Sequence, residues 1–148
     1  MDETSPHARS LRKGRVSQAG QVYSVTAVCK GRESVFKDLF SARVLINVLR
    51  ETEQFDRAQT LCFVVMPDHF HWLVQLGNES NLSTVVRAVK ALSSKRIGHS
   101  IWQKGFYDHA LRSEEDIKEL ARYIVANPLR GGLVESIGDY PHWDAMWL

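Results

Sequence analysis

Two histidines stand one residue apart in an apolar stretch near the middle of the chain. They are His69 and His71, with Phe70 between them. Side chains alternate between the two faces of a β-strand, so the two imidazoles would project together while Phe70 points the other way. A catalytic divalent metal commonly takes about three protein ligands and keeps one position open for substrate. The pair therefore predicts part of a metal site.

A later helix offers candidates for the rest of the site. Tyr123 and Asn127 are four residues apart, so on a helix they lie one turn above each other. Both fall at the edge of that helix's apolar stripe rather than on its solvent side. The carboxamide oxygen of Asn127 can coordinate a hard cation, and the phenol of Tyr123 can be a nucleophile. A helix packed on the sheet would bring these groups near one place.

The apolar pattern predicts the elements that must position these groups. Strands are expected at residues 21–29, 61–66, 69–76 and 101–111, the last interrupted at Gly105. Helices are expected at residues 36–53, from residue 82 to a stop at Gly98, and from a cap at Ser113 to a stop at Asn127 before Pro128. Residues 67–68 form a turn, which makes 61–66 and 69–76 an antiparallel hairpin.

This order of elements is β-α-β-β-α-β followed by one more helix. It predicts an α+β, ferredoxin-like fold: an antiparallel sheet with helices on one face, plus a C-terminal helix that carries the candidate chemistry and a tail. We divide the chain into a basic N-terminal arm at residues 1–20, a single domain at 21–135 and a tail at 136–148 that packs on the domain. The fold alone does not decide a function.

Composition restricts the class of protein. The chain has 148 residues, of which 44% are hydrophobic and 24% charged, so it can bury a core as one domain. No apolar run approaches the roughly 20 residues of a membrane-spanning helix, and the N-terminus lacks the apolar stretch of a signal peptide. Both cysteines sit in strand-like apolar runs, where we expect reduced core thiols. These features lead us to expect a cytoplasmic protein that does not bind membranes.

Basic residues are concentrated in two places, although the net charge is only +2. Residues 80–107 hold five basic side chains and no acidic one, and the N-terminal arm adds more. Such patches suggest that these basic residues contact a polyanion partner at particular places. The alternative is that they form an ordinary solvated helix face. The candidate contacts are Arg12, Lys13, Arg15, Arg87, Lys90, Lys95, Arg96 and Lys104.

Three motifs resemble a known family. The run at residues 66–74, which contains both histidines, is similar to the His-hydrophobic-His signature of the HUH single-strand DNA endonucleases. The runs at 102–109 and 123–134 resemble the REP-associated tyrosine transposases, bacterial single-tyrosine relatives of insertion-sequence transposases. The similarity extends from Gly14 to Pro141, which is nearly the whole chain.

The resemblance implies a role for each candidate residue. Tyr123 would be the catalytic tyrosine, and His69, His71 and Asn127 would hold a divalent cation, Mg²⁺ or Mn²⁺. The implied activity is cleavage and rejoining of single-stranded DNA at palindromic hairpins through a 5′-phosphotyrosine intermediate. The basic residues would hold DNA phosphates. We expect a monomer, with a dimer as the alternative.

Other interpretations of the same residues stay open. The two histidines could be ordinary sheet residues bonded to their neighbours. The main functional alternative is a non-catalytic module that binds single-stranded nucleic acid on a ferredoxin-like sheet. A metal-dependent phosphodiesterase that uses water is a third. A covalent protein–DNA adduct would distinguish the tyrosine transposase from the binding module and from the phosphodiesterase.

Overall fold

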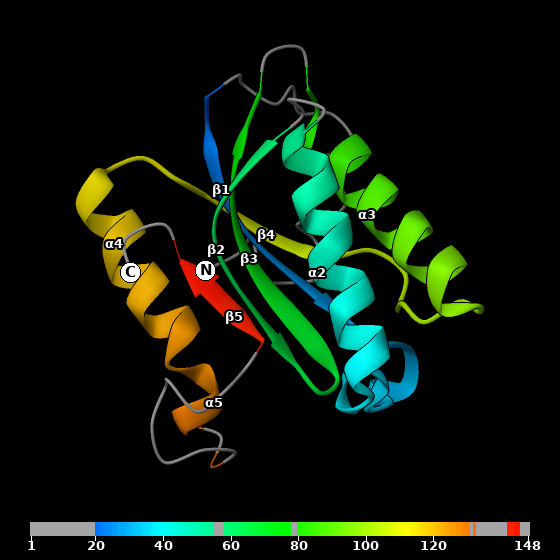
Figure 1. The fold of residues 1–148 in the computed structure, drawn as a ribbon. Coiled ribbons are helices and arrows are strands. Elements are labelled where there is room, and N and C mark those ends of the chain that lie inside the picture. Colours follow the sequence, from blue (N-terminus) through cyan, green and yellow to red (C-terminus); the bar gives the residue numbers. More distant parts are fainter. Residues whose placement is uncertain (1–19, 55–57, 78–79, 131, 133–141, 146–148) are drawn as a thin grey trace.

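A five-stranded antiparallel sheet forms the centre of the fold (Figure 1). The computed structural model describes residues 20–54, 58–77, 80–130, 132 and 142–145. The strands are β1 (Val22–Val28), β2 (Ala58–Met66), β3 (His69–Leu76), β4 (Tyr107–Leu111) and β5 (Trp143–Ala145). Their order across the sheet is β4-β1-β3-β2-β5. The first four strands have the ferredoxin-like order, and β5 extends the sheet beyond β2.

Helices cover both faces of this sheet (Figure 1). Helices α2 (Leu39–Gln54) and α3 (Leu82–Ile97) pack side by side on one face, and α4 (Glu114–Val125) lies on the other. Two short 3-10 turns, η2 (Lys30–Arg32) and η3 (Val35–Lys37), connect β1 to α2, and the short helix α5 (Asn127–Arg130) follows α4. The predicted fold is confirmed: two helices share one face, and the C-terminal helix is an addition that covers the opposite face.

Side-chain alternation along β3 divides the apolar interior into two clusters. Phe70 and Trp72 are fully buried in the cluster that includes α2 and α3. Leu73 belongs to the second cluster, with Ile124 and Val125 of α4. Because β3 residues at odd positions share a face, His69 and His71 project to the same side as Leu73 and α4. The alternation along β3 therefore places the histidine pair on the sheet face that α4 covers.

Capping residues set the helix ends. Helix α2 begins three residues later than predicted, because the carboxylate of Asp38 accepts a hydrogen bond from the backbone N–H of Ser41 at 3.1 Å. The Ser113 hydroxyl accepts from the N–H of Asp116 at 3.1 Å, which confirms the predicted start of α4. Helix α3 ends at Gly98, as predicted, in the left-handed conformation with φ of 111°.

Two predicted boundaries are wrong. The strand expected at 101–111 is continuous only over β4, and Trp102 forms an isolated bridge with Cys29. The expectation that Pro128 keeps Asn127 out of a helix also fails. Helix α4 ends at Val125, and Asn127 is the first residue of α5. Proline is tolerated in the first turn of a helix because no N–H is needed there, so Pro128 can start α5.

Strand β5 was not expected from the sequence. Its residues pair with β2 in the register Val64↔Trp143 and Cys62↔Ala145. Residues 1–19, 136–141 and 146–148, which hold most of the predicted arm and tail, lie outside the described residues. Within the described ranges, no helix combines the length and apolar character needed to cross a bilayer.

Candidate active site

The structure brings His69 and His71 together at the start of β3. Their ring centroids are 4.9 Å apart and the ring planes meet at 80°, so one ring presents its edge to the other. Across the hairpin, His71 pairs with Val64 and His69 with Met66, both in the α4-side cluster. Both histidines are partly buried. Two imidazoles are therefore held side by side on the sheet face that α4 covers.

A carboxylate from the β2–β3 turn contacts the first histidine. Nδ1 of His69 lies 2.7 Å from Oδ1 of Asp68, and Nη1 of Arg32 donates to Oδ2 of Asp68 at 3.3 Å. Burial alone would raise the pKa of Asp68, but the hydrogen bond with His69 and the Arg32 guanidinium lower that pKa below its usual value. Asp68 is therefore ionised at neutral pH. An ionised carboxylate only accepts, so Nδ1 of His69 carries the hydrogen.

A hydroxyl from the neighbouring strand contacts the second histidine. Thr26 on β1 is the direct cross-strand partner of His71 on β3. Oγ1 of Thr26 and Nδ1 of His71 are 2.9 Å apart, within hydrogen-bond distance. A threonine hydroxyl can donate or accept, so the direction follows the tautomer of His71. Each ring of the pair thus has its Nδ1 atom engaged by a different element of the fold.

The segment after β1 holds the turn that carries Asp68. The backbone N–H of Cys29 donates to the carbonyl of Asp68 at 2.8 Å, and the N–H of Phe36 donates to the carbonyl of Pro67 at 2.9 Å. The Arg32 ion pair adds a side-chain contact from the same segment. Residues 67–68 form the turn that the sequence predicted, and these contacts fix its position relative to β1.

Tyr123 and Asn127 lie on the α4 side of the sheet. Tyr123 is 59% exposed, while its neighbours Ile124 and Val125 are buried against the sheet. Tyr123 therefore lies further toward solvent than the predicted edge of the apolar stripe. Asn127 is partly buried at the start of α5, after the break at Ala126. Figure 1 shows α4 and α5 reaching the same end of the sheet as the β2–β3 turn.

The predicted ligand set combines one hard donor, the carboxamide oxygen of Asn127, with two imidazole nitrogens, which are borderline donors for divalent metals. No group of three or more His, Cys, Asp or Glu side chains in the described part of the chain is arranged to hold a metal ion. The predicted set is different, because it combines two imidazoles with the carboxamide of Asn127. With both Nδ1 atoms engaged, coordination would fall to the Nε2 atoms, as is common for histidine ligands.

The predicted DNA contacts that the structure describes lie away from the histidine pair, on α3 and on the loop before β4. Those on α3 lie on the sheet face opposite to the histidine pair, where Arg87 and Lys95 are exposed. The guanidinium of Arg96 instead forms an ion pair with Glu51 of α2, with Nη2 and Oε1 2.9 Å apart. Lys104 is exposed in the loop before β4. Arg12, Lys13 and Arg15 lie outside the described residues.

The Lys90 ammonium group forms hydrogen bonds with the protein backbone. It donates to the carbonyl oxygens of Gln103 and Gly105, at 2.9 Å and 2.5 Å. These bonds hold the loop between Trp102 and β4 against α3. Lys90 therefore has a structural role that the charge pattern alone did not reveal.

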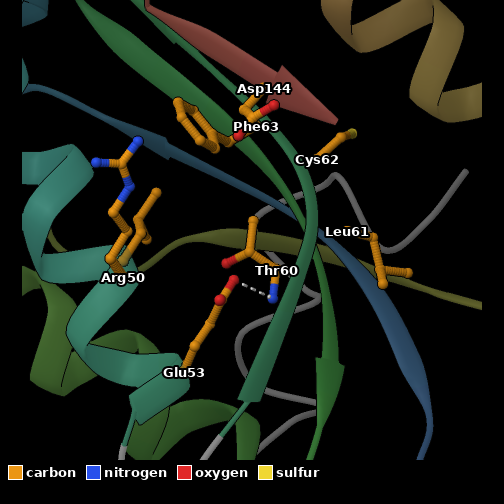
Figure 2. A pocket seen from close by; sticks show the side chains of 8 residues that line it. Arg50, Glu53, Thr60, Leu61, Cys62, Phe63 and Asp144 are labelled. Atoms are coloured by element: carbon orange, nitrogen blue, oxygen red, sulfur yellow. Dashed lines mark hydrogen bonds between the residues drawn. The ribbon is translucent and has the colours of Figure 1, made fainter. Parts of the chain in front are cut away.

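A separate pocket of about 230 Å³ lies between α2 and β2 (Figure 2). Its charged side chains are Arg50, Glu53 and Asp144, so carboxylates outnumber the guanidinium. Figure 2 shows the Glu53 carboxylate accepting from the backbone N–H of Thr60, at 3.1 Å. This contact caps an N–H of β2 beside the bulge between Thr60 and Cys62. The charge of the pocket does not favour DNA phosphates.

The sequence did not point to three residues around the histidine pair: Thr26, Arg32 and Asp68. Asp68 could have been noticed, since a carboxylate next to a histidine is a frequent partner of its ring. Thr26 is 45 residues from His71 and becomes its partner only through the β1–β3 register. Nothing local marks Arg32, which reaches Asp68 because the chain turns sharply there, with φ of 57° at Arg32.

The sequence of this chain is similar to those of known proteins. A family model described as "Transposase IS200 like" matches residues 17–127. A Haemophilus influenzae protein, named provisionally as a REP-associated tyrosine transposase, is 27% identical over 140 residues, covering 83% of this chain and 78% of that protein. The REP-associated tyrosine transposase of Escherichia coli K12 is 33% identical over 82 residues, covering 53% of this chain and only 49% of the relative.

A solved structure has the same fold. It is described as a REP-associated tyrosine transposase bound to a REP hairpin. The two chains superpose with a TM-score of 0.76 at 23% identity, covering 87% of this chain and 79% of that one. At this identity the likeness shows the fold alone.

Proposed function

The chain belongs to the IS200-like transposase family, and from that premise we propose that it cleaves and rejoins single strands of hairpin DNA. Tyr123 is the proposed nucleophile, and His69, His71 and Asn127 are the proposed ligands of Mg²⁺ or Mn²⁺. The observation that carries this proposal is the pair of imidazoles held edge to face on the sheet side that α4 covers. The REP hairpin in the related structure supports this class of substrate.

The surroundings of the proposed ligands fit a metal site. Metal-binding histidines usually have their second nitrogen bound to a carboxylate, carbonyl or hydroxyl. Asp68 and Thr26 stand in those positions for His69 and His71. When bound, a divalent cation would withdraw charge from the scissile phosphate and orient it.

Tyr123 would attack the phosphorus atom in line with the leaving 3′ oxygen. A bond forms between the tyrosine oxygen and phosphorus, and the bond to the 3′ oxygen breaks. The phenol loses its proton and the 3′ oxygen ends as a hydroxyl. The 5′-phosphotyrosine bond retains a phosphodiester, so a 3′-hydroxyl can reverse the step and join strands. The 59% exposure of Tyr123 supports this role, because the nucleophile must reach a polymeric substrate.

The basic residues on α3 would hold the duplex stem rather than the scissile phosphate. Arg87 and Lys95 lie on the face opposite to the histidine pair, so they are poorly placed to touch the same nucleotide as Tyr123. We place the stem phosphates against α3 and the loop that holds Lys104. The unpaired strand would then pass around the edge of the sheet to the α4 side.

The formation of a covalent bond between the protein and DNA tests the proposal. A labelled hairpin oligonucleotide incubated with the protein and Mn²⁺ should give an adduct that survives denaturing electrophoresis. Tyr123→Phe should abolish the adduct and leave hairpin binding intact, since only the phenol oxygen is lost. Tyr107→Phe is the matched control, because Tyr107 on β4 pairs with Thr26, on the histidine face of the sheet. That variant should still form the adduct.

Three outcomes would contradict the proposal. If the wild type binds several hairpins but gives no adduct with any of them, the protein is a binding module or uses water as the nucleophile. If Tyr123→Phe still gives the adduct, another residue attacks the phosphate. Cleavage without an adduct that still requires His69 and His71 would indicate a metal-dependent phosphodiesterase.

A further inference from the structure

We infer that Asp68 and Thr26 are positioning residues of the two histidines: Asp68 fixes the tautomer of His69 and Thr26 holds the ring of His71 through Nδ1, so that Nε2 of each ring is the metal-binding atom. This inference rests on the proposed function, because it assigns the residues that prepare the proposed ligands. The observation behind it is that Nδ1 of each ring is engaged, one by a carboxylate and one by a hydroxyl.

The carboxylate of Asp68 determines the tautomer of His69. At 2.7 Å from an ionised oxygen, Nδ1 must carry the hydrogen, because a lone pair there would face a negative charge. Neutral imidazole has one N–H, so Nε2 then keeps its lone pair for a metal. The negative charge on Asp68 also makes the ring a stronger donor to a cation. Asp68 thus selects the ligand atom of His69.

Asp68 is itself fixed by the segment after β1. Its backbone carbonyl accepts from Cys29, and its second carboxylate oxygen accepts from Arg32. The adjacent Pro67 carbonyl accepts from Phe36. With the turn held by main-chain bonds and the carboxylate by a guanidinium, Oδ1 remains directed at His69. The segment after β1, including η2, therefore helps to set the position of Asp68 and, through Asp68, the orientation of His69.

Thr26 orients the ring of His71, but its hydroxyl can donate or accept and therefore does not select the tautomer. It lies directly across from His71 in the β1–β3 pairing, so the sheet register sets the 2.9 Å separation. With a metal on Nε2, Nδ1 carries the hydrogen and donates to Oγ1 of Thr26. The two proposed ligands consequently differ, since His69 has an anionic partner and His71 a neutral one.

The first test needs neither metal nor DNA. Nitrogen-15 NMR of the imidazole side chains in the metal-free protein reports which ring nitrogen carries hydrogen. The neutral ring of His69 should show the Nδ1–H form, although the Nε2–H form is favoured by free imidazole side chains. Asp68→Ala should shift His69 toward Nε2–H and leave His71 unchanged. Thr26→Val is the control and should leave the tautomer of His69 unchanged. A wild-type His69 ring in the Nε2–H form would overturn the inference.

The second test measures Mn²⁺ binding to the whole chain by the loss of the free-ion signal in electron paramagnetic resonance. Asp68→Ala and Thr26→Val should each weaken binding by about 10–100-fold, the usual effect of removing such a partner. Thr26→Ser keeps the hydroxyl and should restore near-wild-type affinity. Glu33→Gln is the charge control, because it removes an exposed carboxylate from the same segment. The affinity of the Glu33→Gln variant for Mn²⁺ should be close to that of the wild type.

The outcomes separate this inference from the proposed function. If the wild type binds Mn²⁺ and both Asp68→Ala and Thr26→Val bind it equally well, the positioning roles are wrong while the metal site stands. If Glu33→Gln weakens binding as much as Asp68→Ala, the effect is general electrostatics and the inference also fails. If the wild type binds no Mn²⁺, the proposed metal site itself fails, and with it the roles of Asp68 and Thr26 toward a metal.

Discussion

Lys90 on α3 donates a hydrogen bond to the backbone carbonyl oxygen of Gly105, with Nζ and O 2.5 Å apart. A second bond, to the carbonyl of Gln103, fixes the ammonium group between α3 and the loop before β4. Lys90→Met keeps the length of the side chain but removes both bonds. We expect it to lower the free energy of unfolding by about 1–3 kcal/mol, because the partly buried carbonyl of Gly105 loses a charged donor. Urea denaturation measures this loss.

The exposed Lys95→Met variant is the matched control for Lys90. Both residues are lysines of α3, but Lys95 is exposed to solvent. We expect Lys95→Met to leave the stability close to that of the wild type. Equal losses for the two variants would mean that the contacts of Lys90 with the loop contribute little.

Arg87 and Lys95 should dominate the salt dependence of hairpin binding on the α3 face. Each phosphate contact that is lost lowers the slope of log affinity against log salt by about 1. We therefore expect Arg87→Ala and Lys95→Ala to reduce the slope by about that amount each. Arg96→Ala should have a smaller effect, since its guanidinium is paired with Glu51. Fluorescence anisotropy of a labelled hairpin at several salt concentrations provides the slopes, and unchanged slopes would place the stem elsewhere.

Local patterns predicted the sheet elements that carry the histidines. Alternation in residues 69–76 predicted β3 with its observed bounds, because one fully buried face leaves only one workable register. Residues 67–68 predicted the hairpin turn, and the caps at Ser113 and Gly98 marked helix ends correctly. These signals depend on neighbours in the sequence, so a single sequence is sufficient to detect them.

The remaining features depend on contacts between distant residues. Strand β5 has three residues and pairs with β2 some eighty positions earlier, so no local pattern announces it. The loop before β4 is held by Lys90 rather than by strand pairing, which the apolar pattern of 101–111 does not reveal. The partnership of Thr26 with His71 likewise arises only when β1 and β3 pair. The spacing of the residues and the motif resemblance together indicated the proposed ligands, whereas the contacts of Asp68 and Thr26 with them are visible only in the structure.

Cys29 and Cys62 should be inert toward thiol reagents in the folded protein. Both side chains are fully buried, and burial raises the pKa of each thiol to about 12. Only the thiolate reacts, and at pH 8 its fraction would be on the order of 10⁻⁴ even with full access. An aromatic disulfide reagent should therefore report almost no thiol in native buffer and both thiols in urea. Fast reaction in native buffer would show that β2 or the segment directly after β1 opens readily.

Mn²⁺ should stabilise the wild-type protein against heat, because a ligand that binds only the folded state shifts the unfolding equilibrium. At a concentration of 100 times its dissociation constant, the gain is about 2.7 kcal/mol, and a chelator should reverse it. His71→Ala should abolish the shift, since one imidazole ligand is gone. Tyr123→Phe should keep it, because the proposed nucleophile is not a proposed ligand. A melting temperature that rises equally in His71→Ala would place the bound ion away from the histidine pair, and the metal reading of β3 would then be wrong.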